Sequence, residues 1–329
     1  EALARADTVV LDKTGTLTRG KPTLVRVLPF GLSQEEALRL AAALERGSEH
    51  PLAKAVLEAA ESLPQAQAEE VRALPGEGVE GRVEGRRLHL GGPALMERLG
   101  VPLPEEAKAL PEEGYTPLYL VEGTRLLAAF AVFDPPRPEA QEAVAALKAL
   151  GLKLVLLTGD HPAPARRVAE ALGIPEVLAG VRPEGKVEAI RRLQAEGRKV
   201  VFVGDGINDA AALAQADVGL AMGSGTDIAL EAGDVVLLTP DLRGVVNAVR
   251  LARRTLRTIY LNFFWAYAYN VVLIPVAAGA LYPFTGLLLN PMLAAAAMSL
   301  SSLFVLTNSL RLRAFRPQAL PSLNPAASS

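Results

Sequence analysis

The fold of this chain is decided by the segment Asp12-Lys13-Thr14-Gly15-Thr16-Leu17-Thr18, which directly follows the apolar run Val9-Val10-Leu11. A carboxylate at the end of a buried strand lies at the edge of an open α/β sheet, where such folds place their functional groups. Asp12 is therefore a candidate nucleophile, since carboxylates of this kind form aspartyl-phosphate intermediates. The backbone N–H groups and hydroxyls of residues 14–16 can surround the incoming phosphoryl oxygens. The competing interpretation is an aspartate that merely caps a helix or a turn, as in most Asp-x-Thr-Gly strings.

Two further polar motifs follow apolar runs in the same way. Thr158-Gly159-Asp160 comes after residues 154–157, and the segment 204–209, Gly-Asp-Gly-Ile-Asn-Asp, comes after residues 200–203. Both motifs are expected at strand ends, like Asp12. Asp205 and Asp209 stand four apart around a glycine turn, which suits one carboxylate on Mg²⁺ and another in its outer shell. Turn chemistry alone is the alternative, and the preceding buried strand argues against it.

The three motifs, in this order, resemble the phosphorylation domain of the P-type ATPases, which is built on the haloacid-dehalogenase type of Rossmann-like α/β sheet. All seven positions of the first motif match that family's phosphorylation loop, and a fixed heptapeptide rarely recurs by chance. The resemblance implies ATP-dependent phosphorylation of Asp12, with Mg²⁺ at Asp12, the Thr14 carbonyl, Asp205 and Asp209. It also implies that the residues around the transferred group are Lys13, Thr14, Thr158, Gly159, Asp160, Lys186 and Asn208.

Two of these positions carry information of their own. Lys186 stands where the family has a lysine that neutralises phosphate charge, although a helical lysine without that match is usually a solvated surface residue. Related phosphatases have a second aspartate, an acid/base, two residues after the nucleophile, whereas this chain has Thr14. Without that base the phosphoenzyme should hydrolyse slowly, which leaves time for a conformational step. Position 14 therefore favours a pump over a soluble phosphatase.

The composition indicates a chain that is only partly in water. Its 329 residues are 50% hydrophobic and 21% charged, with a net charge of −2 and a mean hydropathy of +0.24. This length predicts two or so domains. The absence of cysteine excludes disulfides and thiolate metal sites within these residues, and the near-neutral charge gives no support for nucleic-acid binding. Residues 1–7 indicate the tail of an upstream helix rather than a signal peptide, so we expect the chain to begin inside a longer protein.

An α+β insert is predicted at residues 21–129. Ser33 begins a capping-box helix and Pro51 begins a second helix, and short strands punctuated by glycines follow. The chain is expected to re-enter the first sheet with the strand at Leu126 to Phe133. This organisation gives a phosphorylation domain at 1–20 and 130–240 and a nucleotide-binding domain at 21–129.

The segment Ser48-Glu49-His50-Pro51-Leu52 resembles the His-Pro signature of heavy-metal-transporting P-type ATPases. The resemblance implies that Glu49 and His50 hold the adenine of ATP, since an imidazole can stack on a purine and a carboxylate can accept from its amine. Gly76 and Gly78 would let the backbone approach the nucleotide closely. The alternative is that His50 only precedes a helix that begins with proline.

A long uncharged segment predicts a membrane hairpin at residues 241–313. The 53 positions from Thr258 to Leu310 contain no charged residue, and one bilayer-crossing helix needs ~20 residues. Two helices fit, with a turn between Tyr282-Pro283 and Asn290-Pro291. Arginines flank both ends of the hairpin, so both ends should be cytoplasmic. A buried soluble hairpin is the alternative, which the length disfavours, and residues 314–329 are expected to form a flexible tail.

Polar residues within this hairpin resemble the membrane metal site of Cu(I)-transporting ATPases. They are Tyr269-Asn270 in the first helix and Met298-x-x-Ser301-Ser302 in the second. The resemblance implies Cu(I) ligation by Tyr269, Asn270, Met298 and Ser302. A thioether suits a soft ion, and no Asp or Glu is present in these helices to favour Zn²⁺. Interhelical hydrogen bonding by Asn and Ser, with Met as packing, is the alternative explanation.

Together these features identify the chain as a member of the heavy-metal P-type ATPases, namely the C-terminal portion of a Cu(I)-exporting, and also Ag(I)-exporting, type. The resemblance implies a multi-pass protein of the cell membrane with cytoplasmic catalytic domains. Expected partners are Cu(I), membrane lipid, the actuator domain and earlier helices of the same pump, and a copper chaperone. The chain alone is expected to bind ATP without pumping. Alternatives are a Zn²⁺/Cd²⁺ pump, a soluble phosphatase, and an ATP-binding fragment without catalysis.

Overall fold

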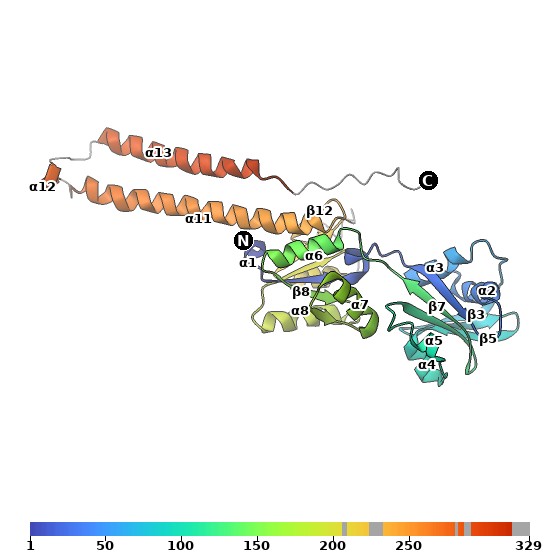
Figure 1. Cartoon of the computed structure of the whole chain (residues 1–329). Coiled ribbons are helices and arrows are strands. Elements are labelled where there is room, and N and C mark those ends of the chain that lie inside the picture. Colours follow the sequence, from blue (N-terminus) through green and yellow to red (C-terminus); the bar gives the residue numbers. More distant parts are fainter. Residues whose placement is uncertain (206–208, 224–232, 280–281, 286–290, 318–329) are drawn as a thin grey trace. The chain divides into compact units, whose positions relative to one another are not determined.

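A computed structural model describes residues 1–205, 209–223, 233–279, 282–285 and 291–317. Its contacts divide the chain into two units. One unit comprises Asp7–Leu242 and contains two β-sheets, and the other combines Glu1–Ala6 with the helical segment that begins at Arg243 (Figure 1).

The first sheet is entirely parallel, with the strand order β12-β11-β10-β1-β8-β9. Its strands are β1 (Thr8–Asp12), β8 (Lys153–Leu157), β9 (Glu176–Leu178), β10 (Val200–Gly204), β11 (Val218–Met222) and β12 (Val235–Leu237). Every residue of β1, β10 and β11 is buried. Continuous apolar runs of this kind are typical of parallel strands that helices cover on both faces.

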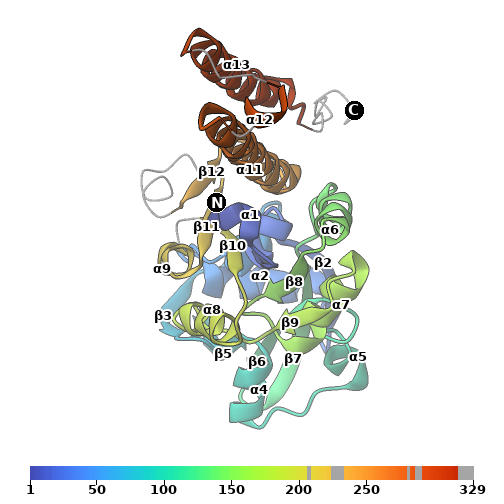
Figure 2. The ribbon, with the colours of Figure 1, turned by 90° about the vertical axis from the view of Figure 1, so that its left-hand side faces the viewer.

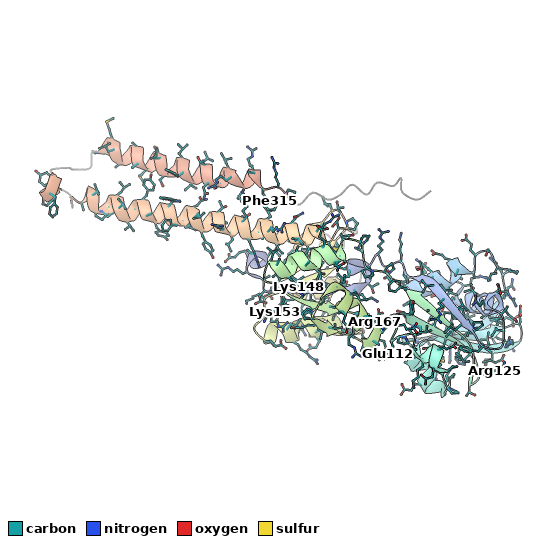
Figure 3. All side chains as sticks on the ribbon, viewed as in Figure 1. Glu112, Arg125, Lys148, Lys153, Arg167 and Phe315 are labelled. Carbon is teal, nitrogen blue, oxygen red and sulfur yellow. The ribbon has the colours of Figure 1, made fainter. Side chains whose placement is uncertain are left out.

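Helices cover both faces of this sheet (Figure 2). One face carries α6 (Ala140–Ala149) and α7 (Pro162–Leu172), which are joined where Lys148 Nζ donates to the Gly173 carbonyl at 2.9 Å (Figure 3). The other face carries α8 (Gly185–Ala195) and α9 (Ala210–Gln215). Their side chains form a core with the strands that includes Val10, Ile190, Phe202 and Leu213. The predicted Rossmann-like sheet is thereby confirmed.

The second sheet is antiparallel, with the order β2-β7-β6-β5-β4-β3. Its strands are β2 (Thr23–Pro29), β3 (Ala68–Leu74), β4 (Gly78–Val83), β5 (Arg86–Gly91), β6 (Thr116–Glu122) and β7 (Arg125–Phe133). α2 (Gln34–Glu45) and α3 (Pro51–Ala59) pack into one hydrophobic core, and α4 (Pro93–Leu99) and α5 (Glu105–Lys108) pack into a separate core. Both α2 and α3 begin where the sequence predicts. Ser33 Oγ accepts from Glu36 N at 3.1 Å, and His50 Nδ1 accepts from Leu52 N at 3.2 Å.

One predicted strand assignment is wrong. The strand expected to re-enter the first sheet at Leu126–Phe133 is β7, which pairs with β2 and β6 in the second sheet. The chain returns to the first sheet only after Phe133, through α6 and β8. The apolar residues of β7 are explained by its position between β2 and β6 and by its two covered faces, because its side chains enter both hydrophobic cores and the strand is almost wholly buried.

The remaining unit consists of α1 (Ala2–Arg5), α11 (Arg243–Ala277), α12 (Tyr282–Thr285), α13 (Pro291–Leu310) and a final turn, η2 (Arg311–Ala314). α11 and α13 are long and apolar enough to cross a membrane. They pack through stacked rings of Trp265 and Phe304, whose centroids are 5.9 Å apart. At the end of the hairpin, the Arg254 guanidinium lies 5.9 Å from the ring centroid of Phe315 (Figure 3).

Candidate active site

The ends of three neighbouring strands bring the sequence motifs together. β1 lies between β8 and β10, and the register pairs Asp12 with Leu157 and Leu11 with Val203. Asp12, Thr158 and Asp205 therefore lie at the same edge of the sheet. Asp12 is only 4% exposed and Thr158 only 1% exposed. The predicted meeting of the motifs arises because parallel strands place their carboxyl ends side by side.

One lysine joins the two buried carboxylates of this site. Lys186 Nζ donates to Asp12 Oδ2 at 3.0 Å and to Asp209 Oδ1 at 2.7 Å. Burial, followed by the hydrogen bond and charge of Asp209, raises the pKa of the Asp12 carboxyl well above its ordinary value, and Lys186 offsets only part of this effect. Burial acts to lower the pKa of Lys186, but Asp12 and Asp209 outweigh it and raise that pKa. The site thus carries an excess of buried negative charge, which a further cation would balance.

The residues present fit a Mg²⁺ ion. Asp209 is 2% exposed, and its Oδ2 is buried without a hydrogen-bond partner among the described residues. Gly204 admits this carboxylate, because a methyl group there would lie 2.8 Å from Asp209 Oδ2. Asp205 lies beside the loop, since a methyl group at Gly15 would be 3.4 Å from Asp205 Oδ2. Mg²⁺ prefers oxygen ligands and usually takes only one or two carboxylates together with substrate phosphates. Among the described residues, no group of three or more His, Cys, Asp or Glu side chains is arranged so that it could hold a metal ion by itself, which agrees with an ion held partly by substrate oxygens.

The loop after β1, residues 13–18, has a defined internal geometry. Gly15 has φ of +80°, which a residue without Cβ adopts freely. The Thr18 N–H donates to the Lys13 carbonyl at 3.0 Å, and the Thr18 hydroxyl donates to Asp134 Oδ2 at 2.6 Å. Burial raises the pKa of Asp134, while the Thr18 hydrogen bond and the Lys13 charge act against it. Asp134 therefore anchors this loop from the segment that follows β7.

The structure describes all but one of the other residues predicted to bind the phosphoryl group. Lys13 is buried and ion-paired with Asp160. Thr158 Oγ1 accepts from the Asp160 N–H at 3.0 Å, which leaves its own hydroxyl hydrogen available for a phosphoryl oxygen. Thr14 is exposed on the loop, and Gly159 follows Thr158 at the strand end. Asn208 lies outside the described residues.

The predicted adenine-binding residues belong to the part of the chain that forms the antiparallel sheet and its helices. Glu49 and His50 are exposed in the connection between α2 and α3. His50 does precede the proline that begins α3, and its side chain also caps this helix, because Nδ1 accepts from Leu52 N. Partial shielding from water lowers the pKa of His50, so the ring is mainly neutral at pH 7 and Nε2 remains for another partner.

The two glycines predicted near the nucleotide differ in their surroundings. Gly76 has φ of +75° and open space around it. A methyl group at Gly78 would lie 2.1 Å from the Leu90 carbonyl oxygen, and one at Gly91 would lie 2.2 Å from the Glu77 carbonyl oxygen. The close approach of β4 and β5 therefore requires glycine at Gly78 irrespective of any ligand. For Gly76, which has open space around it, a close approach of the backbone to the nucleotide stays a prediction.

Sequence reasoning missed Glu45, the last residue of α2. Its side chain is partly buried, and burial raises its pKa to about 7. A carboxyl group with a strongly raised pKa beside a candidate binding loop is itself a candidate functional residue. Its position just before the Glu49-His50 segment is visible in the sequence. Its burial is not, because it depends on how α2 and α3 pack.

Replacing this carboxyl group by the Glu45→Gln substitution should stabilise the protein at alkaline pH. The folded state favours the protonated acid, so the free energy of unfolding is highest below pH 4.5 and falls as the pH rises through about 7. At pH 8 the substitution should raise the free energy of unfolding by on the order of 1–3 kcal/mol, allowing for residual solvent contact. At pH 5 the two proteins should differ little. Thermal unfolding at both pH values checks this result, with Glu35→Gln on the exposed face of α2 as the control. A pH-independent gain would contradict it.

Hydrogen bonds join α11 and α13 near the C-terminal end of α13. Asn262 Nδ2 donates to Ser309 Oγ at 3.0 Å, and Asn308 Nδ2 donates to Asn262 Oδ1 at 2.8 Å. Asn270 lies eight residues after Asn262 on α11, and Ser301 lies eight residues before Ser309 on α13. Because the two helices run in opposite directions, Asn270 and Ser301 should lie at about the same depth. Tyr269 is half-buried, whereas Asn270, Met298 and Ser302 are exposed. The Ser302 hydroxyl donates to the Met298 carbonyl at 3.2 Å, as serines in membrane helices commonly do.

Comparison with known proteins agrees with this geometry. The family of haloacid dehalogenase-like hydrolases matches residues 6–217. The chain belongs to this family of hydrolases. Within it, the chain is similar to Copper-transporting ATPase 1 of Rhizobium meliloti (strain 1021), with 49% identity over 96% of this chain and 39% of that protein. It is also 44% identical to the Silver exporting P-type ATPase of Salmonella typhimurium, over 96% of this chain and 39% of that protein.

Solved structures show the same relationship. A zinc-transporting PIB-type ATPase in the E2.Pi state superposes with a TM-score of 0.69 at 38% identity, covering 94% of this chain and 50% of that one. The catalytic domain of a CPx-ATPase superposes with a TM-score of 0.58 at 29% identity, over 75% of this chain and 90% of that one. The predicted relationship to P-type ATPases is confirmed. The chain spans about two fifths of the length of the curated relatives described above.

Proposed function

We propose that this chain is the catalytic part and final membrane hairpin of an ATP-driven Cu(I) exporter that works through an aspartyl phosphate at Asp12. The observation that carries the proposal is the buried cluster of Asp12, Lys186 and Asp209 at the meeting point of three strand ends. Support for the transported ion comes from relatives at 44–49% identity that are named as copper-transporting or silver-exporting ATPases.

The proposed chemistry is an in-line phosphoryl transfer. A carboxylate oxygen of Asp12 attacks the γ-phosphorus of ATP, the bond to the β-phosphate oxygen breaks, and ADP leaves. Lys186 lies 3.0 Å from Asp12 Oδ2 and offsets negative charge as the transfer proceeds. The Thr158 hydroxyl is positioned at the same sheet edge to donate to a phosphoryl oxygen. Lys13, held by Asp160, adds a second positive charge beside the loop.

Mg²⁺ would be held by Asp12, Asp205 and the Thr14 carbonyl, with Asp209 in the outer shell. When bound, it would neutralise charge on the phosphate oxygens and bridge them to the protein. Two buried carboxylates that share one lysine, and an Asp209 Oδ2 without a hydrogen-bond partner among the described residues, support this assignment. Asp209 itself acts through Lys186, to which it is hydrogen-bonded at 2.7 Å.

The antiparallel sheet with α2 to α5 is proposed as the nucleotide-binding domain, built from residues 21–133 after correction for β7. Glu49 and the Nε2 atom of His50 would contact the adenine, and Gly76 offers open backbone beside it. Glu45 is added as a further candidate for hydrogen bonding to the base, because a carboxyl with a pKa of about 7 can donate as well as accept. The parallel sheet, residues 7–20 and 134–242, would carry the phosphorylated aspartate.

For the membrane part we propose that α11 and α13 are two spans of a multi-pass protein of the cell membrane with both ends in the cytoplasm. Arginines at both ends of the hairpin support this orientation. Tyr269, Asn270, Met298 and Ser302 would contribute to the Cu(I) site, and the similar depths of Asn270 and Ser301 support it. Further ligands, an actuator domain and other helices would come from the rest of the pump, and a copper chaperone is a candidate donor.

Metal-stimulated ATP hydrolysis by the full-length pump under reducing conditions tests the transported ion. Cu(I) and Ag(I) should stimulate hydrolysis, whereas Zn²⁺ and Cd²⁺ should not. Met298→Leu should lower stimulation by Cu(I) by about 10-fold or more, because a soft thioether ligand is replaced by an isosteric hydrocarbon. Met292→Leu, the same change elsewhere on α13, is the matched control and should leave stimulation unchanged.

The zinc pump is the second candidate, because a zinc-transporting ATPase shares this fold with a TM-score of 0.69. Stimulation by Zn²⁺ alone would establish it and would show that the membrane-site assignment is wrong. Equal loss of stimulation in the Met298 and Met292 variants would likewise remove Met298 from the metal site.

A further inference from the structure

Arg137 lies between β7 and α6 and contacts the 13–18 loop through its backbone and its side chain. Its Nε donates to the Thr16 carbonyl at 2.9 Å, and its Nη2 donates to the Gly15 carbonyl at 3.2 Å. Its backbone N–H donates to the Leu17 carbonyl at 2.7 Å. One residue therefore binds three consecutive carbonyl groups of the loop that contains the phosphorylation motif.

These contacts fix the direction of the loop's N–H groups. In a planar trans peptide, the carbonyl of one residue and the N–H of the next point in opposite directions. Holding the carbonyls of Gly15 and Thr16 toward Arg137 therefore turns the N–H groups of Thr16 and Leu17 away from it. The loop contains Gly15 at φ of +80°, and glycine permits many other conformations. An external restraint is needed to select one.

The same guanidinium also reaches a third segment. Its Nη1 donates to the Pro240 carbonyl at 3.0 Å. Pro240 follows β12 and precedes α11 by three residues along the chain. Gly223 lies against this proline, since a methyl group there would be 2.8 Å from Pro240 Cβ. Pro240 thus contacts both Arg137 and the residue that follows β11.

We propose that Arg137 is a positioning residue for phosphoryl transfer, which holds the 13–18 loop in its reactive conformation and ties it to the segment leading into α11. This inference rests on the proposed phosphorylation of Asp12. The acceptors of its guanidinium are the backbone carbonyls of Gly15, Thr16 and Pro240, which a planar group with five N–H donors can satisfy together. A lysine ammonium in the same place could reach only part of this set.

The test compares Arg137→Lys and Arg137→Gln with the wild-type full-length pump. Steady-state phosphoenzyme, kcat and the KM for ATP are measured, and activities are expressed per ATP-binding molecule so that unfolded protein is not counted. We expect kcat and phosphoenzyme formation to fall by about 10-fold or more in both variants, because small misplacement of reacting groups has effects of this size. The KM for ATP should stay within about 2-fold, since the hydrogen bonds of the Arg137 guanidinium go to the 13–18 loop and to Pro240.

Arg198→Gln is the matched control. Arg198 pairs with Glu176 at 2.9 and 3.0 Å, before the start of β10 and away from the loop, and its loss should leave kcat unchanged. A wild-type pump that forms no phosphoenzyme would overturn both the proposed function and this inference. A phosphorylated wild type with Arg137 variants within about 2-fold of its kcat would overturn the inference alone. A rise in the KM for ATP with little change in kcat would also overturn the inference, because Arg137 would then act on nucleotide binding.

Discussion

Asp12→Asn is expected to abolish phosphoenzyme formation and to lower metal-stimulated ATP hydrolysis by at least about 10³-fold, because an amide cannot replace the attacking carboxylate. The substituted protein should remain folded and be somewhat more stable. Asp12 is buried beside Asp209, and the pKa of Asp12 is raised because the folded site disfavours its charge. With asparagine in place, Lys186 and Asp209 form a balanced pair.

The measurements are turnover, phosphoenzyme level and thermal unfolding of the full-length pump. Asp7→Asn is the matched control, because Asp7 precedes the same strand at its opposite end. Lys199 N now donates a hydrogen bond to Asp7 Oδ1 at 3.1 Å, and asparagine keeps a side-chain oxygen that can accept it. Turnover should be unaffected in the Asp7→Asn protein. An active Asp12→Asn protein would remove Asp12 from the chemistry.

Lys186→Met should have the second-largest effect, on stability as well as activity. The substitution leaves Asp12 and Asp209 buried without their shared cation. Breaking a buried ion pair by removing one partner costs about 3–5 kcal/mol, since the other charge remains uncompensated. The free energy of unfolding at pH 7.5 should fall by an amount on that order, and phosphoenzyme should be lost.

A double variant separates the two roles of Lys186. Adding Asp209→Asn to Lys186→Met removes one of the two uncompensated buried charges. The double variant should therefore regain part of the stability without regaining phosphorylation. Denaturant unfolding of the wild type, of the single variants Lys186→Met and Asp209→Asn, and of the double variant gives the coupling free energy. If Lys186→Met were as stable as the wild type, the lysine would not balance these carboxylates. Full recovery of activity in the double variant would show that Lys186 has no part in phosphoryl transfer.

The parallel sheet and its catalytic edge could be predicted from the sequence because the decisive features are local. Apolar runs end directly at Asp12, Thr158 and Asp205, and the carboxyl ends of parallel neighbours must meet. The helix starts at Ser33 and Pro51 were predicted from capping chemistry for the same reason. Lys186 could be placed only through the family resemblance, because nothing in a helical lysine indicates which carboxylates it will meet.

The features that escaped prediction depend on long-range packing. The apolar strand β7 fits either sheet, and its pairing with β6 and with β2, about a hundred residues earlier, assigns it to the second. The raised pKa of Glu45 results from burial between elements. The requirement for glycine at Gly78 comes from the Leu90 carbonyl on the neighbouring strand. In the sequence, Arg137 is an ordinary residue near a helix start, and its role is indicated only by the three backbone carbonyls that its guanidinium binds in the structure.

The most direct test of this account is to identify the residue that receives phosphate. The full-length pump would be incubated with Mg²⁺, the stimulating metal and ATP labelled at the γ-phosphate, quenched in acid, digested and mapped by mass spectrometry. The account predicts an acyl phosphate on the peptide that contains Asp12, stable in acid, released by hydroxylamine and absent from Asp12→Asn. Label on another residue, or a hydroxylamine-resistant phosphate that persists in Asp12→Asn, would contradict it.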